Sequence, residues 1–149
     1  MRSLLALLLL AVGLLAADRP NILVIVGDDM GYADVGFHGC KDIPTPHLDA
    51  LHDQSVRFEQ FYVSPSCSPT RAALLTGMHE FRNGVTHTIQ PREHLNKDAV
   101  ILPQLLLSAG YRTGFVGKWH LGGDGEYAPE KRGFEWGSTN VGGPNVHFD

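Results

Sequence analysis

One segment, at positions 21–26, limits the possible folds of this chain more than any other. It reads Asn-Ile-Leu-Val-Ile-Val, and after its first residue it is wholly apolar and rich in β-branched side chains. Such a short run is typical of a strand that is buried on both faces, as in a parallel sheet covered by helices. The run ends abruptly in Gly27-Asp28-Asp29-Met30-Gly31. Two adjacent carboxylates at the carboxyl end of a buried strand lie where open α/β sheets bind their ligands.

The segments that follow alternate between helical and strand character. A helix is expected to begin at Pro46, with Thr45 as its cap, and another is expected to span 103–109. Aromatic and β-branched residues favour strands at 56–63 and 112–116. This order of elements predicts an α/β architecture with parallel strands.

A further helix is predicted directly after Cys67, which would place that side chain at a helix start. Ser68 is a favourable N-cap, Pro69 fits the first helical position, and Gly77 can end the helix in a left-handed conformation. Arg71 follows one turn later. Cys67 is therefore expected beside free backbone N–H groups at the positive end of a helix dipole, a place that suits an anion.

Two pairs of polar residues are candidates to complete a site. Asp28 and Asp29 offer the hard oxygen ligands that Ca²⁺ and Mg²⁺ prefer, and a solvated turn is the alternative. Lys118 and His120 would share one face of an extended segment, where they suit anion binding and proton transfer. The alternative for this pair is an exposed Lys and a His packed beside Trp119. With the helix start, the two pairs indicate a site for a sulfate or phosphate ester.

The amino terminus predicts export. Arg2 precedes an apolar stretch at 4–15, and Leu15-Ala16-Ala17 fits a cleavage site, so residues 1–17 are predicted to be a signal peptide. The stretch is shorter than the roughly 20 apolar residues of a bilayer span, so we expect no membrane span in the mature chain. The formal net charge of −4 gives no support to nucleic-acid binding.

Cys40 and Cys67 are the two cysteines of the chain. In an oxidising compartment a disulfide between them is the ordinary expectation. A chemical role for Cys67 would instead leave Cys40 without a partner in this chain. The residues alone leave both possibilities open.

Three separated blocks make the chain resemble the type I sulfatases of the alkaline-phosphatase-like superfamily. The blocks are residues 20–31, 67–77 and 110–122, and the middle one carries the specific pattern Cys-x-Pro-x-Arg. The resemblance implies a mixed, mostly parallel sheet flanked by helices. Residues 18–149 would form the N-terminal part of such a catalytic domain.

The resemblance also implies a chemistry for Cys67. A separate formylglycine-generating enzyme would oxidise it to formylglycine, which hydrates to a geminal diol. One hydroxyl of the diol attacks the sulfur of a sulfate ester, possible substrates including carbohydrate sulfates, and the alcohol departs. The other hydroxyl then loses its proton, and sulfate leaves as the aldehyde re-forms. Asp28, Asp29 and residue 67 would bind one Ca²⁺ ion at the site.

The same resemblance assigns roles to four further residues. Arg71 would hold residue 67 and offset charge. Lys118 and His120 would bind the sulfate and help to stabilise the departing oxygen, and His147 would lie near the substrate.

Members of the family are several times longer and carry a later Asp-Asn pair that completes the metal shell. The 149-residue chain alone is therefore expected to be inactive and poorly folded. Two alternatives stay open: a phosphodiesterase or phosphonate monoester hydrolase of the same superfamily, or an inactive exported fragment with a Cys40–Cys67 disulfide. The exported compartment could be the periplasm, the lysosome or the extracellular space.

Overall fold

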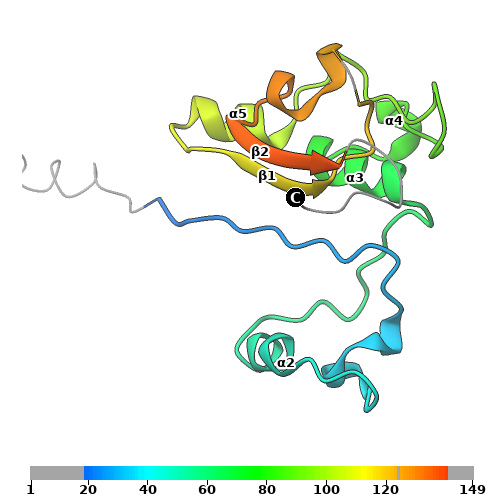
Figure 1. Ribbon diagram of the computed structural model, residues 1–149, viewed down its shortest axis with the longest axis vertical. Helices are drawn as coiled ribbons and strands as arrows, with labels where there is room; N and C mark the ends of the chain where they lie inside the picture. Colours follow the sequence, from blue (N-terminus) through cyan, green and yellow to red (C-terminus); the bar gives the residue numbers. More distant parts are fainter. Residues whose placement is uncertain (1–18, 124, 141–149) are drawn as a thin grey trace, which may run out of the picture. The chain divides into compact units, whose positions relative to one another are not determined.

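A computed structural model describes residues 19–123 and 125–140, which fall into two compact units divided between Ala50 and Leu51 (Figure 1). The predicted signal peptide, residues 1–17, lies outside the described residues and stays a prediction. Among the described residues, no helix combines the length and the apolar character needed to cross a membrane.

The first unit combines an extended segment with short helical turns. Two 3₁₀ turns, η1 (Tyr32–Asp34) and η2 (Gly36–His38), precede the start of α2 (Pro46–Asp53). The Thr45 hydroxyl accepts a hydrogen bond from the backbone N–H of Gly36 at 2.8 Å and donates one to Asp49 Oδ1 at 3.0 Å. These bonds tie η2 to the first turn of α2. Pro46 opens that helix, as its sequence predicts.

The segment at 21–26 is extended, but the prediction of a buried strand is wrong for this structure. It pairs with no strand among the described residues, and its apolar side chains are open to solvent, from Val26 at 42% exposed to Leu23 at 84%. A strand is stabilised by hydrogen bonds and side-chain contacts from its neighbours, not by its own residues. The β-branched pattern therefore fixes the extended backbone and leaves its apolar faces uncovered.

The second unit is built from helices and a parallel pair of strands. Strand β1 (Gly114–Lys118) pairs in parallel with β2 (Trp136–Asn140), so that Gly114 lies opposite Trp136 and Lys118 opposite Asn140. The Trp136 ring lies against Gly114 and leaves no room for a Cβ there. Mixed helices and a parallel sheet confirm the predicted fold class, and β1 begins two residues later than the segment predicted at 112–116.

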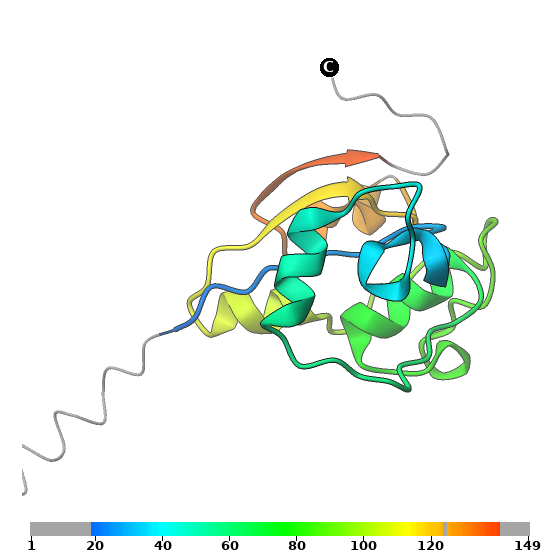
Figure 2. The same cartoon turned by 90° about the horizontal axis from the view of Figure 1, so that it is seen from below.

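The described part of this unit contains the α-helices α3 (Cys67–Thr76), α4 (Glu80–Asn83) and α5 (Leu102–Ser108). Figure 2 shows α3 and α5 on the same side of the β1–β2 pair. Helix α5 confirms the helix predicted at 103–109, with Gly110 in a left-handed conformation just beyond it. The strand predicted at 56–63 is wrong: this segment forms turns and irregular chain, and several of its large apolar side chains are exposed.

The core of the second unit gathers around Trp119, which is 1% exposed. The Trp119 ring packs edge-on against Phe115 at 5.4 Å between centroids, and its Nε1–H donates to the backbone oxygen of Tyr127 at 2.9 Å. The other buried members of the cluster are Ala72, Val85, Leu95, Ile101 and Leu121. A buried Trp with its N–H satisfied is a rigid anchor. It holds the chain at the end of β1, between Lys118 and His120.

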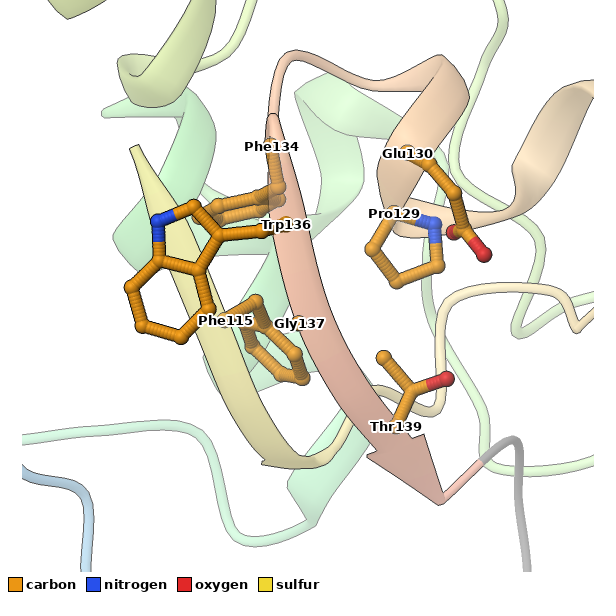
Figure 3. A pocket seen from close by; sticks show the side chains of 7 residues that line it. All are labelled: Phe115, Pro129, Glu130, Phe134, Trp136, Gly137 and Thr139. Carbon is orange, nitrogen blue, oxygen red and sulfur yellow. The ribbon is translucent and has the colours of Figure 1, made fainter. Parts of the chain in front are cut away.

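A small cleft lies between the strands and the 3₁₀ turn η4 (Pro129–Lys131) (Figure 3). Its lining is mostly apolar, with Phe115 and Phe134 on one side. Among its lining residues Glu130 is the one titratable group. This cleft therefore lacks the convergent polar groups of a catalytic site. Its lining residues are Phe115, Pro129, Glu130, Phe134, Trp136, Gly137 and Thr139.

Candidate active site

Helix α3 begins at Cys67 itself, with Ser66 as the N-cap in an extended conformation. The sequence-based assignment of Ser68 as cap and Pro69 as first helical residue is therefore two residues late. Proline fits either register, because the N–H groups of the whole first turn have no helical partner. The C-terminal end agrees with the prediction: Gly77 is left-handed, at φ 66°, and its N–H bonds to the oxygen of Ala73. Cys67 thus occupies the first helical position.

Cys67 meets His120, 53 residues away in the chain. The distance from Cys67 Sγ to His120 Nδ1 is 3.2 Å. His120 has a left-handed backbone, with φ 56°, two residues after the end of β1. Residues other than glycine rarely adopt this conformation, and it persists where the surrounding structure imposes it. The simple alternation expected for an extended Lys118–His120 segment therefore ends at His120, and a local turn sets the direction of the ring.

The far side of the His120 ring faces two acceptors. Nε2 lies 3.0 Å from the backbone oxygen of Thr88 and 3.2 Å from Glu93 Oε2. The side chains of His120 and Glu93 are 15% and 14% exposed. Since both neighbours accept hydrogen bonds, we assign a proton to Nε2; the tautomer with its proton there presents the Nδ1 lone pair to Cys67.

Neither Glu93 nor Thr88 was a candidate from sequence. Thr88 acts through its backbone oxygen, which carries no side-chain signature. Glu93 lies in a polar loop without recognisable ligand spacing. Only the fold brings that loop to the end of β1.

Arg71 and Lys118 also meet, through the main chain of Lys118. Arg71 Nη1 donates a hydrogen bond to the backbone oxygen of Lys118, which links α3 to the last residue of β1. The structure thus brings Cys67, Arg71, Lys118 and His120 into one region of the second unit. The roles assigned to these residues from sequence stay predictions.

Asp28 and Asp29 lie at a bend after the extended segment of the first unit, and both are exposed. Asp29 is left-handed, with φ 56°. Two adjacent carboxylates are a donor set that Ca²⁺ accepts, so these residues fit a share in its coordination. No group of three or more His, Cys, Asp and Glu side chains that could hold a metal ion occurs among the described residues. Because residue 67 belongs to the second unit, a cation bound jointly by all three stays a prediction.

Two further predictions concern His147 and the Cys40–Cys67 disulfide. His147 lies outside the described residues, and its position near the substrate stays a prediction. Cys40 and Cys67 are both free thiols, so the alternative Cys40–Cys67 disulfide is not formed in this structure.

The sequence is similar to those of known sulfatases. The family model described as Sulfatase matches residues 20–146. The chain is 43% identical over 159 residues to N-acetylgalactosamine-6-sulfatase of Mus musculus, an alignment that covers 97% of this chain and 30% of that protein. It is 47% identical over 133 residues to arylsulfatase A of Bos taurus, covering 85% of this chain and 26% of that protein. The chain therefore spans less than a third of the length of these relatives.

Solved structures agree with the sequence relatives. The crystal structure of Ps i-CgsB matches with a TM-score of 0.75 and 40% identity, covering 85% of this chain and 29% of that one. The structure of BT4656 in complex with its substrate D-glucosamine-2-N,6-O-disulfate matches with a TM-score of 0.68 and 34% identity, covering 80% of this chain and 23% of that one. By its sequence over residues 20–146 and by its fold, the chain belongs to the sulfatase family.

Proposed function

We propose that this chain carries the nucleophile of an enzyme that hydrolyses a sulfate ester. One observation supports the proposal above all others: Cys67, in the pattern Cys-Ser-Pro-Thr-Arg, opens helix α3 with its Sγ 3.2 Å from His120 Nδ1. A nucleophilic position needs a base within hydrogen-bond reach and a positive environment for the anion. The N-terminus of a ten-residue helix and a histidine ring supply both.

We propose that residue 67 acts as formylglycine, with Cys67 Sγ standing where an oxygen of its hydrate would be. The hydrate supplies a nucleophilic hydroxyl, and Ca²⁺ supplies positive charge for that oxygen and the sulfate. Asp28 and Asp29, with residue 67, would hold the ion. The maturation step requires a formylglycine-generating enzyme as a partner.

The side chains of this chain then have distinct tasks. His120 Nδ1 is within reach of residue 67 and can accept a proton from an oxygen placed there. Lys118 would bind the sulfate as a point charge, together with His120. Arg71 would hold residue 67 from one turn further along α3, while its bond to the backbone of Lys118 keeps α3 against the end of β1. His147 is proposed to contact the substrate.

The substrate class we propose is a sulfated carbohydrate. The support comes from the names of the relatives, which include N-acetylgalactosamine-6-sulfatase, and from the sulfated glucosamine bound in a structural neighbour. We further propose that residues 1–17 direct the protein out of the cytoplasm.

Two measurements on the full-length protein test this function. Co-expression with a formylglycine-generating enzyme should lower the mass of the peptide containing residue 67 by about 18 Da, because an aldehyde replaces the thiol. The matured protein should then hydrolyse an aryl sulfate, and Cys67→Ala should abolish that turnover while Cys40→Ala retains it. Faster turnover of an aryl phosphate diester than of the aryl sulfate would favour the phosphodiesterase alternative and contradict the proposal.

A further inference from the structure

We propose that Glu93 is a positioning residue that, together with the Thr88 carbonyl, orients His120 toward residue 67. This inference rests on the proposed sulfatase function, because it assigns Glu93 a part in presenting the base of that reaction. The contacts form a continuous series: Glu93 Oε2 to His120 Nε2 at 3.2 Å, and His120 Nδ1 to Cys67 Sγ at 3.2 Å. Glu93 itself does not touch the reacting atom.

The Glu93 side chain is largely buried, so its contact with His120 matters for the stability of the carboxylate. A carboxylate that is 14% exposed loses much of its hydration and needs partners inside the protein. His120 Nε2 is the nearer of its two histidine neighbours, since His94 Nε2 lies 4.0 Å from the other oxygen, Glu93 Oε1. The carboxylate therefore sits between two imidazole rings and makes its short contact with the ring that faces residue 67.

Backbone contacts hold Glu93 in register with His120. The N–H of Leu95, two residues after Glu93, donates to the oxygen of Leu121 at 3.2 Å. Leu121 directly follows His120, and the side chains of Leu95 and Leu121 are both in the core. On the other side of Glu93, the N–H of Thr86 bonds to the oxygen of Arg92 and closes the loop. The segment carrying Glu93 thus lies beside the segment carrying His120.

The two acceptors at His120 Nε2 determine where the ring proton lies, and therefore whether Nδ1 presents a lone pair. In the tautomer whose proton is held on Nε2 by Thr88 and Glu93, the Nδ1 lone pair is directed at residue 67. The ring torsion of histidine is broad and roughly two-fold, so an unheld ring would rotate its carbon edge into that position for part of the time. A carboxylate that fixes the tautomer and orientation of a working histidine is a recurrent arrangement in enzymes and metal sites.

Kinetics on the matured full-length protein test the inference. Glu93→Leu should lower kcat by about 10- to 100-fold with KM changed less than about 2-fold, because orientation of the base is lost while Lys118 still binds the sulfate. Glu93→Gln keeps an acceptor oxygen and should recover part of that loss. Glu126→Gln, at an exposed position in η3 (Gly125–Tyr127), makes the same change of charge and should behave as wild type.

A second measurement does not depend on turnover. Protein expressed without the maturation enzyme keeps the Cys67 thiol, and its His120 Nε2–H should give a slowly exchanging ring-proton signal in ¹⁵N NMR, assigned with His120→Gln. Glu93→Leu should speed that exchange, and Glu126→Gln should not. If Glu93→Leu fails to fold, the comparison of Glu93→Gln with wild type carries the test.

The outcomes separate the two proposals. A His120 ring proton whose protection depends on Glu93, combined with no sulfatase turnover by the matured full-length protein, supports the positioning and contradicts the function. Sulfatase turnover with kcat and ring-proton exchange unchanged in both Glu93 variants overturns the positioning alone.

Discussion

Cys67 and His120, 53 residues apart in the chain, place Sγ and Nδ1 3.2 Å from each other. One residue opens helix α3, and the other stands in a left-handed turn just after β1. The contact therefore depends on two local features, a helix start and a strand end, that are stable for separate reasons. The core around Trp119 keeps them together.

Removing the ring of His120 should impair the chemical step and, because His120 is also proposed to contact the sulfate, should raise KM as well. We expect His120→Gln to lower kcat by about 10²- to 10⁴-fold in the matured full-length protein, the usual contribution of a positioned acid–base group. His47→Gln, at an exposed position in α2, is the matched control and should leave kcat unchanged. Steady-state kinetics with an aryl sulfate would measure both, and a His120 variant with wild-type kcat would refute the role.

Ser68 is a site where a substitution should stabilise the protein. Its side chain is fully buried, and its hydroxyl has no hydrogen-bond partner among the described residues. Because a buried unsatisfied hydroxyl is unfavourable, Ser68→Ala should raise the free energy of unfolding by about 1 kcal/mol. The change leaves the Cys-x-Pro-x-Arg pattern intact, so the mass shift at residue 67 should persist. Denaturant unfolding measures the effect, and a clear loss of stability would show that the hydroxyl has a partner.

Arg132 should be among the most sensitive positions of the second unit. Its side chain is buried, at 3% exposed, and donates to the backbone oxygens of Asn96, Lys97 and Ala99 at 2.9–3.1 Å. Arg132→Met would leave these oxygens unsatisfied and should lower the free energy of unfolding by about 3 kcal/mol.

Arg112 provides the control for that experiment. Its guanidinium is exposed and pairs with Glu135 at 2.8 Å, the kind of surface pair that contributes little. Arg112→Met should therefore change stability much less than Arg132→Met in the same chemical denaturation series. Equal losses from the two substitutions would contradict the proposed importance of the buried contacts.

Acid should destabilise the protein partly through Glu135. The backbone N–H of Thr113 and the guanidinium of Arg112 bond to this carboxylate and hold the pKa of Glu135 below its ordinary value. A lowered folded-state pKa adds stability above the pKa of the unfolded chain, and that contribution is lost as pH falls through the folded-state value. Thermal melts between pH 6 and pH 3 should show a steeper loss of Tm for wild type than for Glu135→Gln. Parallel curves would rule out this contribution.

Local signals predicted helices α2, α3 and α5 and strand β1, because these signals depend on residues close in sequence. Gly77 ends α3 as expected, and β1 lies within two residues of its predicted place. The strand predicted at 21–26 failed because a strand requires neighbours that no local pattern supplies. The cap of α3 was misplaced by two residues because serine stands on both sides of Cys67.

The same distinction, between local sequence signals and contacts that arise only in the fold, applies to the residues of the candidate site. Cys67, Arg71, Lys118 and His120 could be proposed from sequence because their side chains carry chemistry at motif spacing. Thr88 was missed because a backbone oxygen has no residue signature, and Glu93 because its role arises only where two loops meet. Joint coordination of a cation by Asp28, Asp29 and residue 67 is untested and stays a prediction.

Trp119 stands between Lys118 and His120 in sequence, with its own side chain packed in the core. A core residue therefore adjoins two proposed site residues in the chain. A change in the packing of Trp119 would displace Lys118 and His120 through a single peptide bond. In a screen scored only by turnover, substitutions of Trp119 would look like losses of a catalytic group. A parallel measurement of folded protein would identify them as errors of placement.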